Sequence, residues 1–395
     1  MINKIIFVFL LSFLVECTCV AQEFSTQILT GAEQMDEYLP LLRNKNVALL
    51  VNQTSVVKQT HLVDTLLAEG IRIQKIFAPE HGFRGTNDAG EKIKDGMDVK
   101  TQIQITSLYG EHKKPSSESL QGIDIVLFDI QDVGARFYTY ISSLQYMMEA
   151  CAEYNIPLLI LDRPNPNGFY VDGPVLEPTY TSFVGMQSIP IVHGMTVAEY
   201  AKMLNEEKLL KNKLMCSLYI TPCKYYNHSM LYAPPIPPSP NLQTLSAILL
   251  YPSLCLFEGT DVSVGRGTET PFEVWGHPSF SIKSFAFQPK SMAGAKSPPH
   301  QNKTCFGANL HQEPQVLIKA LNKKIQLKYL QEAYSLSKDK EHFFTPFFQK
   351  LVGNSTLQLQ IKQGKQEKEI RQSWEKKLTA FKKIRKKYLL YTDFE

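Results

Sequence analysis

The chain has 395 residues, of which 44% are hydrophobic and 20% are charged, and its formal net charge at pH 7 is +4. This composition excludes a disordered or collagen-like chain, and the length allows two globular domains of ordinary size. The charge is modest for this length, so it gives no reason to expect a nucleic-acid partner. Basic residues gather in the last third, where we interpret them as the solvated face of a C-terminal helix.

The first 21 residues have the pattern of a secretory signal peptide. A short basic start, Met1–Lys4, precedes an apolar run, Ile5–Val15, that is too short to span a bilayer comfortably. Cys19 and Ala21 supply the small residues of a cleavage site. We therefore expect export across the inner membrane to the periplasm, with a lipoprotein anchored at Cys17 or Cys19 as the weaker alternative. No later apolar stretch is long enough to predict a membrane helix.

Strand-like and helix-like segments alternate from Asn46 onward. The predicted strands are Val47–Val51, Ile71–Phe77, Ile123–Phe128, Pro157–Leu161 and Leu218–Thr221. The predicted helices are His61–Glu69, Phe137–Tyr154 and Thr196–Leu210, the last beginning with a capping box of Thr196 and Glu199. The alternation predicts an α/β fold with a Rossmann-like, doubly wound, mostly parallel sheet.

A proline-dense stretch, Tyr232–Asn241, interrupts this pattern and forms either a linker or a rigid wall of a cleft. Helical patterns return at Leu242–Leu254, within Ala308–Lys340 and at Ile370–Tyr391. We therefore divide the chain into a signal peptide (1–21), a Rossmann-like domain (22–231) and a smaller C-terminal α/β domain (232–395). Five cysteines remain after residue 21; their odd number and irregular spacing predict neither a disulfide framework nor a zinc site, although pairing of Cys216 with Cys223 stays open.

Polar clusters follow four of the predicted strands. In chain order they contain Asn52; Glu80, His81 and Arg84; Asp129, Asp132 and Arg136; and Asp162, Arg163 and Asn165. Because the carboxyl ends of parallel strands share one edge of a sheet, we expect these clusters to line a single crevice. A structural role is the simpler interpretation for each residue alone: Asp132 could cap a helix, Asp162 could stabilise a turn, and Glu80 could pair with Arg84. The set as a whole favours a binding site.

A second candidate region, Phe257–Thr268, combines Glu258, Asp261 and Arg266 with three glycines. It lacks the third glycine and following helix of a dinucleotide fingerprint, and it fits carbohydrate or carboxylate recognition better. Tyr138 could stack on a sugar ring or pack in the core. The chain contains no P-loop, no G-x-S-x-G elbow and no H-E-x-x-H motif, so we expect neither a nucleotide nor a metal or other cofactor.

Taken in order, several motifs resemble the bacterial exo-β-N-acetylmuramidase family, glycoside hydrolase family 171, long catalogued as a domain of unknown function. They are Asn52–Thr54, Pro79–Gly85, Asp129–Tyr140, Asp162–Pro166, Phe257–Thr260 with Ser263–Thr268, and Lys386–Tyr391. The resemblance covers nearly all of the chain after the signal peptide. It implies an enzyme that removes N-acetylmuramic acid from the non-reducing end of peptidoglycan-derived glycans, with a cleft between a catalytic Rossmann-like domain and a C-terminal auxiliary domain. The segment Lys290–Lys303 matches no motif, and is either a surface insertion or part of the cleft rim.

Glycoside hydrolysis needs a group that protonates the leaving oxygen and a second group that supplies or directs a nucleophile. We assign the general acid to Glu80, because apolar neighbours would bury it and raise its pKa. For the second group we rank Asp129 and Asp132 ahead of Glu258, and the substrate's N-acetyl group could itself assist.

The lactyl carboxylate of muramic acid calls for a cation, which Arg136, Arg163 or Arg266 could supply in a bidentate pair. His81 and His193 would orient hydroxyl groups or the acid. The alternative function is a non-catalytic periplasmic binding protein for cell-wall sugars. Several carboxylates beside a carboxylate-bearing ligand argue against it. Anomeric stereochemistry, glycan length preference and oligomeric state remain open.

Overall fold

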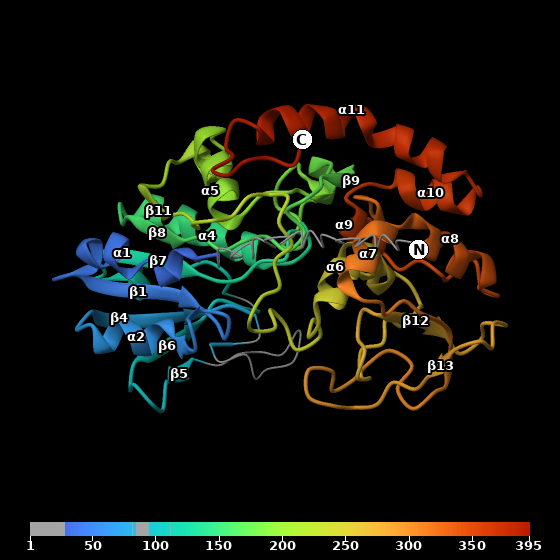
Figure 1. Cartoon of the computed structure of the whole chain (residues 1–395), viewed down its shortest axis with the longest axis horizontal. Helices are drawn as coiled ribbons and strands as arrows, with labels where there is room; N and C mark the ends of the chain where they lie inside the picture. The colour runs from blue at the N-terminus through green and yellow to red at the C-terminus, as the bar shows by residue number, and fades with distance from the viewer. Residues whose placement is uncertain (1–27, 81, 84–94, 111) are drawn as a thin grey trace, which may run out of the picture.

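The computed structural model describes residues 28–80, 82–83, 95–110 and 112–395. The expected signal peptide and two candidate site residues, His81 and Arg84, lie outside these ranges. Figure 1 shows two lobes side by side, a sheet lobe built on the long β-sheet and a helical lobe that begins at α6 (Leu245–Leu254). Among the described residues, no helix combines the length and the apolar character needed to cross a membrane.

The sheet lobe contains a seven-stranded sheet in the order β11-β8-β7-β1-β4-β6-β5. Its strands are β1 Asn46–Val51, β4 Arg72–Ala78, β5 Gly96–Met97, β6 Gln104–Ser107, β7 Ile125–Asp129, β8 Leu158–Leu161 and β11 Leu218–Thr221. All neighbours pair in parallel except β5, which runs antiparallel to β6. The chain fills one side of β1 with β4 and β6, then returns to its other side with β7. The predicted doubly wound fold is therefore confirmed, with its switch point between β1 and β7.

Helices cover both faces of this sheet. Successive side chains of a strand point to opposite faces, and in the central strands both sets are apolar, so both faces must be buried. On one face Val47 and Leu49 pack with α1 (Met35–Leu42) and α2 (Leu62–Ala68). On the other face Ala48 and Leu50 join a larger core that includes α4 (Tyr140–Glu153) and α5 (Val197–Glu206). The predicted capping box of α5 is present, with Thr196 and Glu199 exchanging side-chain and backbone hydrogen bonds.

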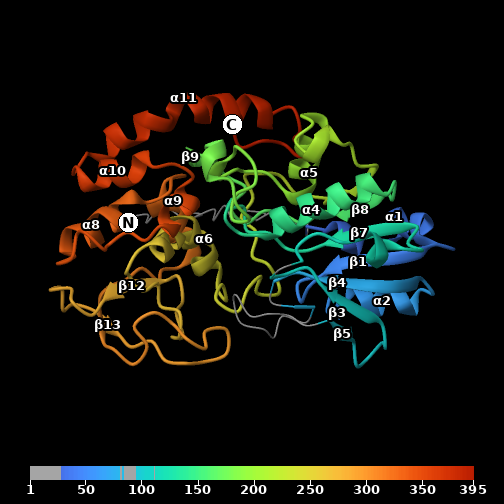
Figure 2. The same cartoon turned by 180° about the vertical axis from the view of Figure 1, so that it is seen from behind.

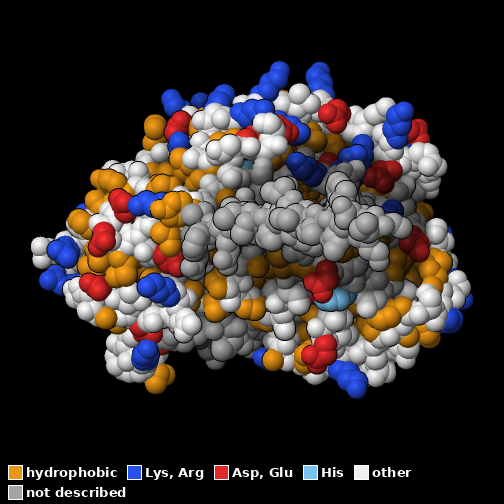
Figure 3. All heavy atoms as spheres, viewed as in Figure 1, with side chains coloured by type: hydrophobic (Ala, Val, Ile, Leu, Met, Phe, Trp, Pro, Cys, Tyr) orange, Lys and Arg blue, Asp and Glu red, His pale blue; other side chains and the backbone are white. Residues whose placement is uncertain are grey.

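The helical lobe combines short helices with a three-stranded antiparallel sheet in the order β12-β14-β13. Its remaining elements are β12 Val274–His277, β13 Ala286–Phe287, β14 Cys305–Asn309, α7 Pro314–Leu321, α8 Leu327–Leu336, α9 Phe347–Val352 and α10 Thr356–Lys362. The last helix, α11 (Glu367–Arg385), runs from this lobe back over the sheet lobe, as both ribbon views show (Figures 1 and 2). Lys and Arg side chains stand along that upper edge in Figure 3, as expected for a solvated basic helix face.

The short elements were the hardest to predict. Two-stranded pairs form between β2 (Val56–Val57) and β3 (Thr60–His61), and between β9 (Asp172–Val175) and β10 (Pro190–Val192), and α3 (Ser117–Leu120) is a single turn. Strand β5 lies in a stretch, 91–100, whose glycine and charged residues are typical of a loop; residues 91–94 lie outside the described part. Helix α4 begins at Tyr140 rather than Phe137, because residues 137–139 form a turn in which the backbone N–H of Tyr138 donates to Ala135.

Candidate active site

A cleft of about 270 Å³ lies between the two lobes, and we call it the interlobe cleft. Both lobes and the proline-dense segment contribute to its walls. Its lining residues are Glu80, Tyr109, Phe137–Tyr140, Phe183, Val184, Ser239, Leu242, Tyr251, Cys255, Glu258, Arg266, Phe272, Phe347 and Leu351. The cleft thus opens beyond the carboxyl end of the parallel sheet, where ligands bind in open α/β folds.

Glu80 follows the end of β4, and both of its carboxylate oxygens accept hydrogen bonds from hydroxyl groups. The Tyr109 hydroxyl lies 2.9 Å from Oε1, and Thr139 Oγ1 lies 3.1 Å from Oε2. Burial and the neighbouring Glu80 raise the pKa of Tyr109 well above its ordinary value, so the phenol stays protonated. These two contacts fix the orientation of the Glu80 carboxyl group on the cleft wall.

Glu258 and Arg266 lie on the helical-lobe wall of the same cleft. Arg266 Nε lies 2.6 Å from Glu258 Oε1, and the Cys255 thiol lies 3.4 Å from Glu258 Oε2. The guanidinium carbon stands 5.1 Å from the centre of the Phe272 ring. Among the described residues, only Nε of this guanidinium has a hydrogen-bond acceptor, so its two terminal amino groups remain to bind a carboxylate.

The proline-dense segment forms a wall of the cleft rather than a free linker. The Tyr138 hydroxyl donates to the Pro238 carbonyl at 2.7 Å, and Gln53 donates to the carbonyls of Pro237 and Pro238 at 3.2 Å. Tyr138 therefore lines the cleft with its ring while its hydroxyl holds the segment against the sheet lobe. Lys290, within the unassigned segment Lys290–Lys303, donates its backbone N–H to Gly267 beside Arg266.

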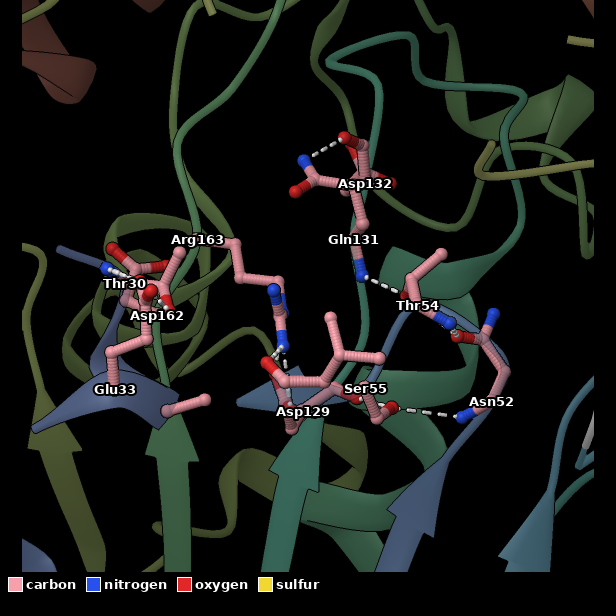
Figure 4. A network of polar contacts seen from close by, with 12 residues as sticks. Thr30, Glu33, Asn52, Thr54, Ser55, Asp129, Gln131, Asp132, Asp162 and Arg163 are labelled. Atoms are coloured by element: carbon pink, nitrogen blue, oxygen red, sulfur yellow. Dashed lines mark hydrogen bonds and ion pairs between the residues drawn. The ribbon is translucent and has the colours of Figure 1, made fainter. Parts of the chain in front are cut away.

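Asp129 and Arg163 form a buried ion pair with each other and do not line the cleft. Figure 4 shows the two side chains pointing toward one another, with Arg163 Nε 2.5 Å from Oδ1 and Nη2 2.9 Å from Oδ2. Both are almost completely buried, and Nη2 also donates to the carbonyl of Val56. Asn52 is equally buried and accepts from the backbone N–H of Thr54 at 2.9 Å and from its hydroxyl at 2.6 Å. None of the three lines the interlobe cleft, and Arg163 instead lines a separate pocket with Glu33 and Tyr232.

Asp132 is buried behind the aromatic wall formed by Tyr138 and Tyr140. Its Oδ2 accepts from the Gly134 N–H at 2.6 Å in a local turn, not as a cap of α4. Its Oδ1 has no hydrogen-bond partner in the described part of the chain. Burial raises the pKa of this carboxyl group to about 7. Asp132 does not line the cleft, and its buried carboxyl group takes up a proton at a higher pH than an exposed aspartate does.

Four further candidates lie in the scaffold. Asp162 accepts from the Ala198 N–H at 3.0 Å at the start of α5 and from the Tyr391 hydroxyl at 2.6 Å, and burial raises its pKa to about 6. Asn165 donates to Met195 O. His193 is buried, and burial lowers its pKa to about 3, so its ring is neutral. Arg136 is buried between the lobes. None of these four lines the cleft among the described residues.

The structure therefore brings Glu80, Tyr138, Glu258 and Arg266 together on the cleft. Sequence reasoning missed Tyr109, because it follows β6, a strand whose weak pattern was not predicted. It also overlooked Thr139, which lies inside a quoted motif. No group of three or more His, Cys, Asp or Glu side chains within the described ranges is arranged to hold a metal ion. The five cysteines at 151, 216, 223, 255 and 305 are all buried thiols.

Comparisons with known proteins place this geometry in a family. The model for the N-terminal domain of the exo-β-N-acetylmuramidase NamZ matches residues 47–246, and the model for its C-terminal domain matches residues 249–391. The peptidoglycan β-N-acetylmuramidase NamZ of Bacillus subtilis (strain 168) is 36% identical in an alignment 386 positions long, which covers 92% of this chain and 92% of that protein. The family models meet after the proline-dense segment, whereas our sequence boundary precedes it.

Two solved structures of DUF1343 family proteins from Bacteroides fragilis NCTC 9343 share the fold. One is 47% identical with a TM-score of 0.87, covering 93% of this chain and 100% of that chain. The other is 28% identical with a TM-score of 0.75, covering 92% of this chain and 99% of that chain. With both family models matched and a relative aligned along nearly the whole sequence, the chain belongs to the exo-β-N-acetylmuramidase NamZ family.

Proposed function

We propose that this protein is an exo-acting glycosidase that releases N-acetylmuramic acid from the non-reducing end of peptidoglycan fragments. The observation that carries the proposal is that a carboxyl group and a guanidinium face the interlobe cleft from opposite walls. A carboxyl group, Glu80, is oriented by two hydroxyl groups on one wall, and a guanidinium, Arg266, faces the cleft from the other.

Glu80 is proposed as the general acid. The hydroxyls of Tyr109 and Thr139 can donate to the ionised carboxylate, and each can turn to accept once the carboxyl group carries a proton. The same two side chains would therefore hold Glu80 in place before and after it protonates the leaving oxygen. For the second group we favour Glu258 over Asp129 and Asp132, since Glu258 lines the cleft and neither aspartate does.

Arg266 is proposed to bind the lactyl carboxylate that distinguishes muramic acid from glucosamine. Its terminal amino groups form the fork that a carboxylate matches in a bidentate pair. Glu258 fixes the guanidinium through Nε and Phe272 supports its face, so the fork is oriented before substrate binds. We also propose, from the pattern of Met1–Ala21, that the protein acts in the periplasm during turnover of the cell wall.

The test uses the mature protein, its Glu80→Gln variant and a Glu37→Gln control on the exposed face of α1. Each is incubated with a muramyl-glucosaminyl disaccharide, and released N-acetylmuramic acid is followed by mass spectrometry. We expect release by the wild type and the control, and loss of release in Glu80→Gln with unchanged folding by circular dichroism. No release by any of the three, with tight disaccharide binding in calorimetry, would instead establish a binding protein.

A further inference from the structure

Arg136 joins the two lobes through backbone carbonyls alone. Its Nη1 donates to the carbonyls of Pro174 at 3.0 Å and Ile189 at 2.9 Å, both in the sheet lobe. Its Nη2 donates to the carbonyls of Leu351 at 2.6 Å and Val352 at 2.9 Å, at the end of α9 in the helical lobe. One planar guanidinium therefore spans the junction with two hydrogen bonds on each side.

The environment of this side chain is unusual for a buried cation. It is 1% exposed, and no carboxylate pairs with it among the described residues. Burial lowers its pKa to about 9. The carbonyls at the C-terminal end of α9 carry partial negative charge and have no hydrogen-bond partners within the helix. The guanidinium supplies the missing donors, and the partial negative charge of the carbonyls stabilises its positive charge. Such a site has no room for a substrate carboxylate, which is why the lactyl role expected for Arg136 does not fit.

Gly353 is part of this arrangement. It follows α9 in the left-handed region, with φ +84°, which a side chain adopts only with strain. A Cβ atom there would lie 3.0 Å from Arg136 Nη2 and 2.9 Å from the Cα of Leu176. The helix end, the glycine and the guanidinium are thus fitted to one another without spare space.

The segments held together by Arg136 continue directly into the two walls of the interlobe cleft. Residues 137–140, directly after Arg136, line the sheet-lobe wall, and Phe347 and Leu351 on α9 line the opposite wall. We propose that Arg136 is a positioning residue that sets the separation of the two cleft walls, and thereby the fit of the bound sugar. This inference rests on the proposed function only for the identity of that sugar.

Lysine is the informative substitution. It keeps a positive charge, but its ammonium group is a compact point with three donors and cannot reach four carbonyls in one plane. Arg371 offers a matched control, because it also joins the lobes through a guanidinium. It binds Asp172 at 2.8 and 3.1 Å through Nη1 and the Ile325 carbonyl at 2.6 Å through Nη2, and it does not line the cleft.

The experiment compares Arg136→Lys and Arg371→Lys with the wild type, using thermal unfolding and kinetics on the muramyl-glucosaminyl disaccharide well below every Tm. We expect both variants to lose thermal stability. Arg136→Lys alone should raise KM about tenfold, equivalent to ~1.4 kcal/mol, while Arg371→Lys keeps KM within about twofold. Equal KM values in the two variants would overturn the positioning role. Should Arg136→Lys fail to fold, Gly353→Ala, which displaces the guanidinium, is measured in its place with the same expected rise.

Hydrogen exchange separates this inference from the proposed function. Amide exchange across α9 needs no substrate, and we expect it to accelerate in Arg136→Lys but not in Arg371→Lys. If the wild type proves inactive, the proposed function fails, and the exchange result still decides whether Arg136 holds this wall. Unchanged exchange across α9 in Arg136→Lys would refute the inference whatever the activity.

Discussion

The Tyr109 hydroxyl donates a 2.9 Å hydrogen bond to Oε1 of Glu80, although the two residues follow different strands, β6 and β4. These strands pair in parallel, from Ile76 with Ile105 to Ala78 with Ser107, so their ends deliver both side chains to one place. The orientation of the proposed acid therefore depends on the register of this strand pair.

Removing the Tyr109 hydroxyl tests that dependence. Tyr109→Phe keeps the ring but removes this one hydroxyl donor, so we expect kcat to fall roughly 10- to 100-fold because the carboxyl group is held less firmly in its productive orientation. The measurement is the initial rate of N-acetylmuramic acid release. Tyr219→Phe, on the exposed edge strand β11, serves as the control. A kcat for Tyr109→Phe equal to that of the control would separate this contact from catalysis.

Arg266→Ala should abolish discrimination for the lactyl carboxylate. A hydrogen-bonded ionic contact contributes about 1.5–3 kcal/mol, so we expect kcat/KM for the muramyl disaccharide to fall about 10- to 100-fold. The rate on a glucosaminyl disaccharide, which lacks the lactyl group, should fall less, because that substrate loses only the effect of the Arg266 contact with Glu258. Competition assays with the two sugars measure the ratio directly. If the preference for the muramyl sugar survives in Arg266→Ala, another cation binds the lactyl group.

The strand ends were predictable because parallel pairing sends them to one edge. Buried apolar runs marked β1, β4, β7 and β8. Figure 4 shows the polar residues at the ends of β1, β7 and β8 lying at that edge. The sequence could not show which of these polar residues line the cleft and which are buried in the scaffold. Asp129 is the last residue of β7 and Glu80 follows β4, yet Asp129 pairs with Arg163 away from the cleft and Glu80 lines the cleft. That difference depends on which side chain finds a buried partner, and it comes from contacts between distant segments.

The helical lobe was harder to predict for a different reason. Strand β14 contains Gly307 and ends at Asn309, and β13 has only two residues, so neither has a clear alternating pattern. They become strands by pairing with one another and with β12. The role of Arg136 was equally hidden, because its four acceptors are backbone carbonyls that carry no sequence signal.

Asp132 should make the protein less stable as the pH rises. The pKa of its carboxyl group is about 7 in the folded state against 3.8 as the reference value, so the folded state binds this proton more tightly than the unfolded state. Stability is therefore full below about pH 4 for this group and declines as the pH rises toward 7. Asp132→Asn should flatten that decline and raise Tm at pH 8. Urea unfolding across pH 4–8 measures it, with Asp36→Asn, an exposed site on α1, as the control. Parallel pH profiles for Asp132→Asn and the wild type would contradict the assignment.

The Asp129–Arg163 pair should stabilise the fold without contributing to substrate affinity. Removing the charge of one partner leaves the other buried and unpaired, so we expect Asp129→Asn to lower the free energy of unfolding by about 3–5 kcal/mol. The double variant Asp129→Asn with Arg163→Met should recover part of that loss, because it no longer buries an isolated guanidinium. Urea denaturation gives the three free energies, and calorimetry with N-acetylmuramic acid gives the affinity of the folded protein. Because neither side chain lines the interlobe cleft, Kd should stay within about twofold of the wild type. A large loss of affinity with little loss of stability would move this pair from the scaffold into the binding site.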